Sequence, residues 1–138
     1  MSVDSTLGPP SLVCLDTKTH PTGDLTVVEA DDIGFLFARA YFLHNLSEGS
    51  VRGSHAHRRL SQLLIPVSGT FTVETEYRGI HASFLLDNPS EGLLIRPLTW
   101  RTLVGFSSGA VCLVLASSAY SELDYIREYE EFVLESGL

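Results

Sequence analysis

Short runs of β-branched and aromatic residues, each ended by turn residues, cover most of the chain. Their length and their separation by Gly, Pro, Asn, Asp and Ser are typical of strands rather than helices. In residues 70–77, Phe71 and Val73 alternate with polar residues, as expected for a strand with one buried face, and Arg78-Gly79 then closes a hairpin. The pattern predicts an all-β fold, either a β-barrel or a two-sheet sandwich. The predicted strands are residues 12–16, 24–30, 35–43, 62–69, 70–77, 81–87, 92–100 and 110–118.

The two ends of the chain depart from this pattern. Residues 1–11 contain Gly-Pro-Pro and few apolar groups, so we expect a loose lead-in. Residues 121–136 carry Leu123, Ile126 and Val133 at helical spacing, with acidic residues between them. The sequence therefore predicts one C-terminal helix over 121–136, or two short helices, packed against the β-structure.

Length and charge limit the kinds of protein this chain can be. A chain of 138 residues makes one domain, 1–138, and no apolar stretch approaches the roughly 20 residues of a membrane span. Nine basic against seventeen acidic residues give a net charge of −8, which disfavours nucleic acid and membrane surfaces as partners. No signal peptide is recognisable, and Cys14 and Cys112 lie in apolar runs typical of reduced core cysteines. We therefore expect a cytoplasmic protein.

A histidine pair is the most specific feature of the sequence. His55 and His57 are two residues apart, so on a strand both imidazoles leave the same face of the sheet. Histidine titrates near pH 7 and serves as a general acid or base. Taken alone, the pair is equally well explained by two surface histidines on a solvated strand. Arg52, Gly53 and the long apolar run that follows favour a buried functional wall instead.

This region resembles the first motif of the cupin superfamily. Gly49 lies six positions before His55, and Gly69 lies seven positions after Gln62, both in register with that motif. Gln62 stands where metal-binding cupins have glutamate, and no late histidine occurs near Trp100. Two imidazoles without a carboxylate or a third histidine are a poor metal site. The resemblance therefore implies a jelly-roll cupin with no metal and no other cofactor.

A narrower resemblance extends from Asp24 to Phe132. Four segments, in order and at matching spacing, resemble those of the nucleotide-sugar 3,4-ketoisomerases. They are RAYFL at 39–43, RGSHAHR at 52–58, GLLIRPLTW at 92–100, and the stretch from LASSAY to DYIREY at 115–129. The chain is thus identified as a member of that family. Membership implies an all-β, cupin-type jelly-roll β-barrel with a short C-terminal helix.

The resemblance implies a reaction on dTDP-4-keto-6-deoxy-D-glucose in deoxy- or amino-sugar biosynthesis, in which the ketone moves from carbon 4 to carbon 3. Such a shift needs a base for the proton beside the ketone and a group that returns a proton to the next carbon. We assign the carbon 3 proton to His57, and we expect His55 to protonate carbon 4 or to steady the enediol. Tyr41 is expected to polarise the oxygen or relay a proton, because its hydroxyl both donates and accepts. Gln62 is expected to hydrogen-bond one of the two histidines.

The diphosphate of this substrate requires cations in a protein of negative net charge. Arg52 and Arg39 are the first candidates, and Arg96 and Arg101 form a second pair. Trp100 is a candidate for stacking on the base or the sugar, although a lone tryptophan is more often a core residue. An arginine taken singly is more often a solvated surface residue. Arg52 is the exception, because it shares the histidine motif.

The configuration left at carbon 4 is the finer question within the family. Its members form galacto or gluco products, and the residue after the motif tryptophan is histidine in some members and arginine in others. Arg101 occupies this position and favours the gluco product. Thr22 stands where the family commonly has a larger residue, which counts against that preference.

The sequence leaves alternatives open for the oligomeric state and for the function. The family forms homodimers by exchange of N-terminal strands, and the short runs at 12–16 and 24–30 need a neighbouring sheet edge, so we expect a homodimer. The alternative is a monomer whose N-terminal hairpin folds back on itself. Two other functions remain: a non-catalytic cupin that binds a nucleotide sugar through the same wall, and a metal-dependent oxygenase or epimerase, which Gln62 disfavours.

Overall fold

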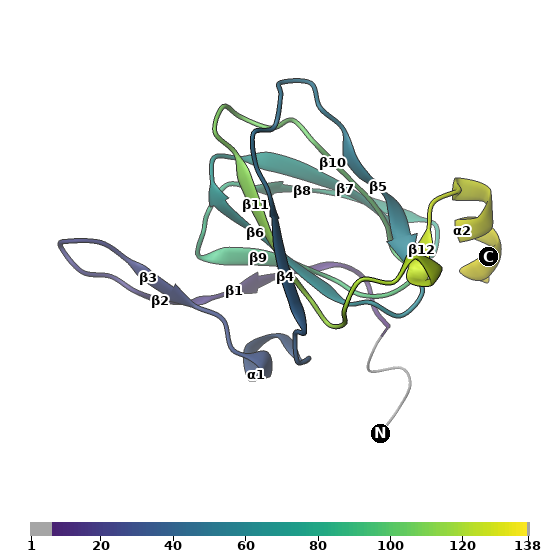
Figure 1. Cartoon of the computed structure of the whole chain (residues 1–138), viewed down its shortest axis with the longest axis horizontal. Helices are drawn as coiled ribbons and strands as arrows, with labels where there is room; N and C mark the ends of the chain where they lie inside the picture. The colour runs from purple at the N-terminus through teal and green to yellow at the C-terminus, as the bar shows by residue number, and fades with distance from the viewer. Residues whose placement is uncertain (1–6, 138) are drawn as a thin grey trace.

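Two five-stranded antiparallel sheets face each other and enclose the core (Figure 1). The structure, a computed structural model, describes residues 7–137. One sheet has the strand order β1-β9-β6-β11-β4 and the other β12-β5-β10-β7-β8, while β2 and β3 pair separately. The prediction of an all-β jelly-roll barrel with a short C-terminal helix is confirmed.

The element bounds are as follows. The first sheet contains β1 (Ser11–Cys14), β9 (Glu91–Ile95), β6 (Gln62–Ser68), β11 (Val111–Ala116) and β4 (Arg39–Leu43). The second contains β12 (Tyr125–Ile126), β5 (Arg52–His57), β10 (Trp100–Val104), β7 (Phe71–Tyr77) and β8 (Ile80–Leu86). The remaining elements are β2 (Asp16–Lys18), β3 (Leu25–Val27), α1 (Ala30–Ile33), a 3₁₀ turn (Glu122–Asp124) and α2 (Tyr129–Glu135).

The two-residue period of the strands determines which side chains fill the barrel. Leu64, Val73, Leu93, Leu103 and Val114 come from five strands and are almost completely buried in one cluster between the sheets. Burying each such side chain contributes about 2 kcal/mol. Burial of this cluster therefore fixes the register of these strands, and with it the positions of the residues on the opposite face of each strand.

Two of the predicted strands that carry candidate site residues are divided or shortened in the structure. The prediction of one strand over 92–100 is wrong, because β9 ends at Ile95 and β10 begins at Trp100. Pro97 has no N–H for the ladder, and the backbone N–H of Leu98 donates to the carbonyl of His57 at 2.8 Å. The predicted strand 35–43 is limited to β4, since the chain leaving α1 turns at Gly34, whose φ is +83°.

The C-terminal helix is shorter than the predicted 121–136. Residues 122–126 form a 3₁₀ turn and β12, and only Tyr129–Glu135 is α-helical. Ile126 is completely buried beside Phe132 of α2, and β12 pairs with β5. Backbone pairing with β5 and burial of Ile126 therefore outweigh the helical pattern of this segment.

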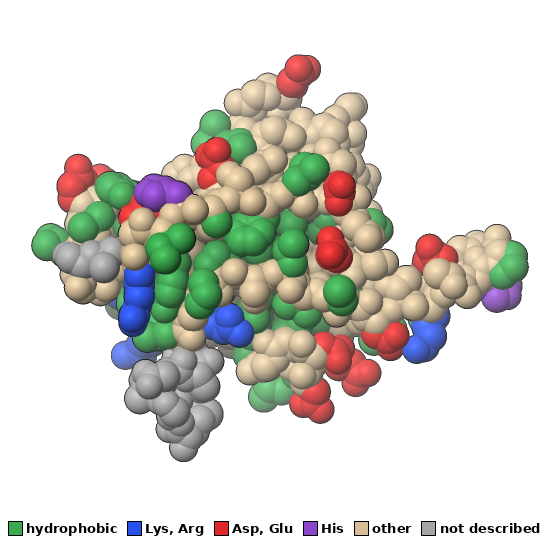
Figure 2. Space-filling view, turned by 180° about the vertical axis from the view of Figure 1, so that it is seen from behind, with side chains coloured by type: hydrophobic (Ala, Val, Ile, Leu, Met, Phe, Trp, Pro, Cys, Tyr) green, Lys and Arg blue, Asp and Glu red, His purple; other side chains and the backbone are tan. Residues whose placement is uncertain are grey.

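The outer face of the first sheet carries a second apolar cluster. Leu63, Ile65 and Leu115 pack there with Ile33 of α1, while Phe42 is exposed. The β2–β3 hairpin extends away from the body of the molecule (Figures 1 and 2). Of the predicted lead-in, residues 1–6 lie outside the described residues, and Ser11 already belongs to β1. No helix in the described part of the chain is long and apolar enough to cross a membrane.

Candidate active site

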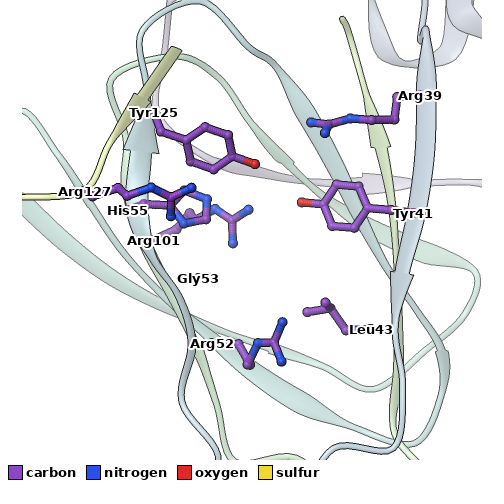
Figure 3. Close-up of a pocket in the computed structure, with 9 residues that line it drawn as sticks. All are labelled: Arg39, Tyr41, Leu43, Arg52, Gly53, His55, Arg101, Tyr125 and Arg127. Carbon is purple, nitrogen blue, oxygen red and sulfur yellow. The ribbon is translucent and has the colours of Figure 1, made fainter. Parts of the chain in front are cut away.

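A cavity of about 320 Å³ opens between β4 of the first sheet and β5, β10 and β12 of the second (Figure 3). It brings together five of the predicted site residues, which lie far apart in the sequence. The complete lining consists of Arg39, Tyr41, Leu43, Arg52, Gly53, His55, Arg101, Tyr125 and Arg127.

Four arginines make the cavity strongly positive in a protein of net charge −8. Arg127 forms an ion pair with Glu122, with Nε–Oε2 at 2.7 Å. Arg39, Arg52 and Arg101 have no acidic partner within ion-pair distance among residues 7–137. Guanidinium groups without carboxylate partners are suited to hold an anionic ligand.

The histidine pair lies on β5, as predicted, and both rings leave the same face of the strand. The ring centroids of His55 and His57 are 4.9 Å apart, with the rings perpendicular. Of the two, His55 lines the cavity, whereas His57 is only 5% exposed and lies against the ring of Tyr125. The cavity therefore presents His55 first and His57 behind it.

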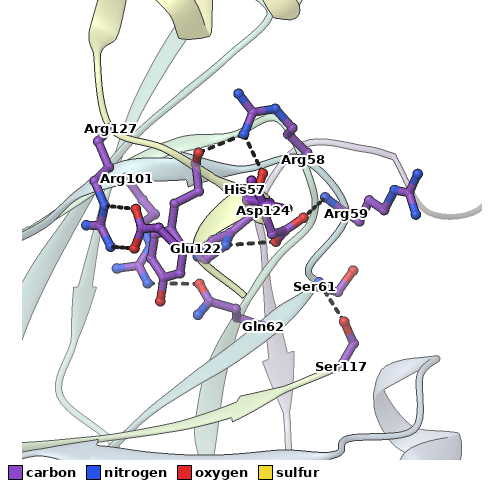
Figure 4. Close-up of polar contacts among 12 residues, drawn as sticks. His57, Arg58, Arg59, Ser61, Gln62, Arg101, Ser117, Glu122, Asp124 and Arg127 are labelled. Carbon is purple, nitrogen blue, oxygen red and sulfur yellow. Dashed lines mark hydrogen bonds and ion pairs between the residues drawn. The ribbon is translucent and has the colours of Figure 1, made fainter. Parts of the chain in front are cut away.

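Asp124 is the hydrogen-bond partner of His57 (Figure 4). Its Oδ2 lies 3.0 Å from Nδ1 of His57, and its Oδ1 accepts the backbone N–H of Arg59 at 2.8 Å. The 3₁₀ turn carries Asp124 to this position, and Arg58 fixes the turn by donating to the carbonyls of Leu123 and Tyr125. Arg58 also pairs with Glu135 of α2, as described below.

Burial and neighbouring cations keep both imidazoles neutral at neutral pH. Desolvation lowers the pKa of His55 to about 2, with further lowering by Arg101, His57 and Arg127. Desolvation and Arg101 lower the pKa of His57 to about 4, although Asp124 acts in the opposite direction. A neutral imidazole keeps a free lone pair on one ring nitrogen, so each ring has an acceptor atom, while the lowered pKa values show that the surroundings disfavour the protonated form.

Gln62 links Arg101 to Tyr41 rather than to a histidine. Its Oε1 accepts from Nη2 of Arg101 at 2.9 Å, and its Nε2 donates to the hydroxyl of Tyr41 at 3.0 Å. The expectation that Gln62 hydrogen-bonds a site histidine is therefore wrong. Gly53 makes room for this arrangement: its φ is +69°, and a Cβ there would collide with the guanidinium of Arg101.

Two predicted binding residues lie outside the cavity. Arg96 donates to the carbonyl of Pro9 in the N-terminal segment. Trp100 packs edge-on against Tyr129 of α2, with ring centroids 5.5 Å apart, and also contacts Phe132. We therefore withdraw Arg96 and Trp100 as candidate ligand contacts; Trp100 has the packing role that is usual for a lone tryptophan.

The C-terminal segment supplies site residues that the sequence analysis missed. Tyr125 and Arg127 line the cavity, while Ile126 between them is buried on the other side. This two-residue alternation is a strand signal, and it was obscured by the helical spacing of the apolar residues. The guanidinium of Arg127 lies over the ring of Tyr125, 4.2 Å from its centroid. Leu43, also missed, completes the lining on β4.

Arg58 connects this segment to α2. Its guanidinium forms two hydrogen bonds with the carboxylate of Glu135, at 2.8 and 2.7 Å, and lies 3.3 Å from Glu131. The segment that carries Asp124 and Tyr125 is thus held between β5 and α2. Among residues 7–137, no three His, Cys, Asp or Glu side chains gather as they would around a metal ion.

Comparisons with known proteins agree in fold and family. Residues 10–136 match the family model described as FdtA: WxcM-like, C-terminal. The TDP-4-oxo-6-deoxy-alpha-D-glucose-3,4-oxoisomerase of Aneurinibacillus thermoaerophilus is 37% identical over 111 residues, 80% of each chain.

Solved structures give the same result. The chain is similar to a mutant of the 3,4-ketoisomerase QdtA from Thermoanaerobacterium thermosaccharolyticum, in which a histidine is replaced by asparagine, in complex with TDP-4-keto-6-deoxyglucose. Their TM-score is 0.90 at 34% identity, covering 94% of this chain and 95% of that chain. The WlaRB TDP-quinovose 3,4-ketoisomerase of Campylobacter jejuni gives a TM-score of 0.88 at 32% identity, covering 93% and 99%. Because the family model matches almost the whole chain, this protein belongs to the FdtA-like family, which comprises sugar 3,4-ketoisomerases with the cupin fold.

Proposed function

We propose that this protein converts dTDP-4-keto-6-deoxyglucose to its 3-keto isomer. The observation that carries the proposal is the cavity itself, in which unpaired arginines surround a neutral imidazole and two tyrosine hydroxyls. Cations suit a diphosphate, and an imidazole suits a proton beside a ketone. The substrate named for the QdtA complex and for the A. thermoaerophilus relative supports the same sugar.

Arg39 and Arg52 are the proposed diphosphate ligands. They lie on facing strands, β4 and β5, on the two sides of the cavity (Figure 3). A diphosphate between them would receive charge-assisted hydrogen bonds from both walls. Arg101 is 3% exposed and is committed to Gln62, so we place it beside the sugar rather than the nucleotide.

His55 is now the preferred base for the carbon 3 proton. The role predicted for His57 from the sequence fits His55 better, because of the pair it is His55 that lines the cavity. His55 takes the proton from carbon 3, the C–H electron pair forms the C3–C4 double bond, and the carbon 4 carbonyl becomes an enediolate oxygen. Asp124 contacts His57 only, so it stabilises a positive charge on that ring rather than on His55.

The second half of the reaction restores the ketone at carbon 3. Carbon 4 receives a proton, the hydroxyl proton on oxygen 3 passes to oxygen 4, and the oxygen 3 electron pair forms the new carbonyl. Substrate and product are isomers, so the reaction consumes no oxidant and no reductant. For the configuration at carbon 4 we retain the gluco product, with Arg101 as the residue that favours it. The WlaRB relative supports this choice, because quinovose is 6-deoxyglucose.

We also propose a cytoplasmic homodimer formed through the N-terminal strands. The projecting β2–β3 hairpin and the apolar outer face of the first sheet, where Phe42 is exposed, support a second copy as the partner. In this arrangement β1, which pairs with β9, would be exchanged between the two subunits.

Incubation with dTDP-4-keto-6-deoxyglucose in deuterated water, followed by proton NMR, tests the proposed reaction. We expect the 3-keto isomer to form with deuterium at carbon 4, and deuterium to enter carbon 3 of the remaining substrate. Tight binding of the substrate without exchange or product would overturn the proposal in favour of a non-catalytic sugar-nucleotide-binding protein.

A further inference from the structure

The hydrogen bonds around Gln62 have a fixed direction. A guanidinium only donates, so the amide atom that faces Arg101 must be the oxygen. The amide nitrogen therefore faces Tyr41 and donates to its hydroxyl oxygen. The Tyr41 proton cannot be donated to Gln62, and the hydroxyl has no other hydrogen bond among residues 7–137. Figure 3 shows this hydroxyl directed into the cavity, so the proton is available there.

The product configuration requires groups on two sides of the sugar. In a gluco sugar the hydrogens on carbons 3 and 4 lie on opposite faces of the ring, whereas in a galacto sugar they lie on the same face. His55 and His57 both come from β5 and so reach one face. Tyr41 comes from β4, on the opposite side of the cavity (Figure 3). A gluco product thus needs a proton donor where Tyr41 stands.

We propose that Gln62 is a positioning residue, which holds the Tyr41 hydroxyl so that its proton is delivered to carbon 4 on the face opposite His55. Arg101 sets the direction of the relay by occupying the Gln62 oxygen. In the step, Tyr41 gives its proton to carbon 4 while the C3–C4 double bond supplies the electron pair. The Gln62 N–H remains on the tyrosine oxygen, and solvent then returns a proton to Tyr41 and removes one from His55.

Gln62 is well placed for a polarity test because it is 1% exposed and both of its amide atoms are used. Gln62→Glu keeps the size of the side chain and the bond from Arg101. The second carboxylate oxygen, however, accepts the Tyr41 proton and withdraws it from the cavity. Gln62→Met removes both hydrogen bonds, so nothing from this side chain orients the Tyr41 hydroxyl. Asn88→Asp, the same amide-to-acid change at an exposed turn outside the cavity, is the matched control.

The inference rests on the proposed function, including the gluco product. One NMR assay in deuterated water distinguishes failure of the Gln62–Tyr41 relay from failure of the isomerase function. For Gln62→Glu we expect product formation to fall about 10²-fold, while deuterium exchange at carbon 3 of the substrate stays close to the wild-type rate. Gln62→Met and Tyr41→Phe should likewise lower product formation while exchange at carbon 3 continues. The double variant Gln62→Glu/Tyr41→Phe should be no slower than Tyr41→Phe alone, because both changes remove one relay. Asn88→Asp should match wild type.

Several outcomes would contradict the relay. One is equal loss of exchange and product in both Gln62 variants, which indicates a general structural role. Another is wild-type product formation in Gln62→Glu. A galacto product from the wild-type enzyme would overturn the inference while leaving the isomerase function intact. A wild-type enzyme that neither exchanges nor isomerises would contradict the proposed function itself.

Discussion

Nδ1 of His57 lies 3.0 Å from Oδ2 of Asp124, a residue 67 positions later in the chain. The other carboxylate oxygen already accepts the backbone N–H of Arg59. A carboxylate only accepts, so His57 carries its proton on Nδ1 and leaves Nε2 free. Within the described residues that Nε2 is buried and has no hydrogen-bond partner. The C-terminal segment thereby sets the tautomer of a histidine on β5.

Asp124→Asn should reverse this tautomer. The asparagine oxygen can still accept the Arg59 N–H, but its NH₂ group would then donate to Nδ1 of His57 and move the imidazole proton to Nε2. We expect kcat to fall, though no further than in His57→Asn, because Asp124 acts through that ring, and nitrogen-15 NMR of the imidazole to report the change. Glu130→Gln, at an exposed position on α2, is the control and should behave as wild type. An unchanged His57 spectrum in Asp124→Asn would contradict this account.

The histidine roles can be assigned by single substitutions. Asparagine keeps a hydrogen-bonding shape but takes no proton at neutral pH, so His55→Asn should lower turnover by about 10²–10⁴-fold. Exchange at carbon 3 should fall in parallel, with little change in affinity for dTDP measured by calorimetry. His57→Asn should impair turnover less severely. If His57→Asn alone abolishes exchange, the base is His57, as first predicted from the sequence.

Arg52→Ala should weaken binding before it affects chemistry. One charge-assisted hydrogen bond to the diphosphate contributes about 1.5–3 kcal/mol, so we expect the dTDP dissociation constant to rise about 10- to 100-fold with kcat nearly unchanged. Arg78→Ala removes the same charge from the β7–β8 turn, away from the cavity, and should leave affinity unaltered. A loss of kcat at unchanged affinity would assign Arg52 to the chemical step instead.

The stability of the protein should decrease on acidification. The pKa of His57 falls from 6.5 in the unfolded chain to about 4 in the folded protein, and that of His55 to about 2. As the pH drops below 6.5 the unfolded state binds protons first, so the free energy of unfolding decreases between about pH 6.5 and pH 4. Melting temperatures at pH 7.5 and pH 5 measure this change. His57→Gln should reduce the difference, whereas His20→Gln on the exposed hairpin should not; a pH-independent melting temperature would be inconsistent with buried neutral histidines.

Light scattering tests the dimer. We expect twice the chain mass of 15.1 kDa at micromolar concentration, because the apolar outer face of the first sheet and the projecting hairpin would then be covered. Phe42→Glu, which places a charge on that face, should lower the mass toward that of the monomer. A wild-type mass of one chain would refute the dimer.

Features of this protein that depend on local pattern could be predicted from the amino-acid sequence. Two-residue alternation defines the strands, and the Arg52–His57 segment places the two imidazoles on one face of β5 because side chains two apart on a strand point the same way. This motif and three further segments identified the family, and with it the residues on β4, β5 and β10 that the cavity brings together.

The other features depend on contacts between segments that lie far apart in the chain, so they could not be predicted from local pattern. Residues 121–136 have helical spacing, yet pairing of β12 with β5 and burial of Ile126 turn Tyr125 and Arg127 into the cavity and Asp124 onto His57. Arg96 and Arg101 flank the same loop. Arg101 is buried inside the barrel, whereas Arg96 lies against the N-terminal segment and donates to the carbonyl of Pro9. A spacing rule cannot separate such cases, since the energy that decides them comes from partners that the local sequence does not contain.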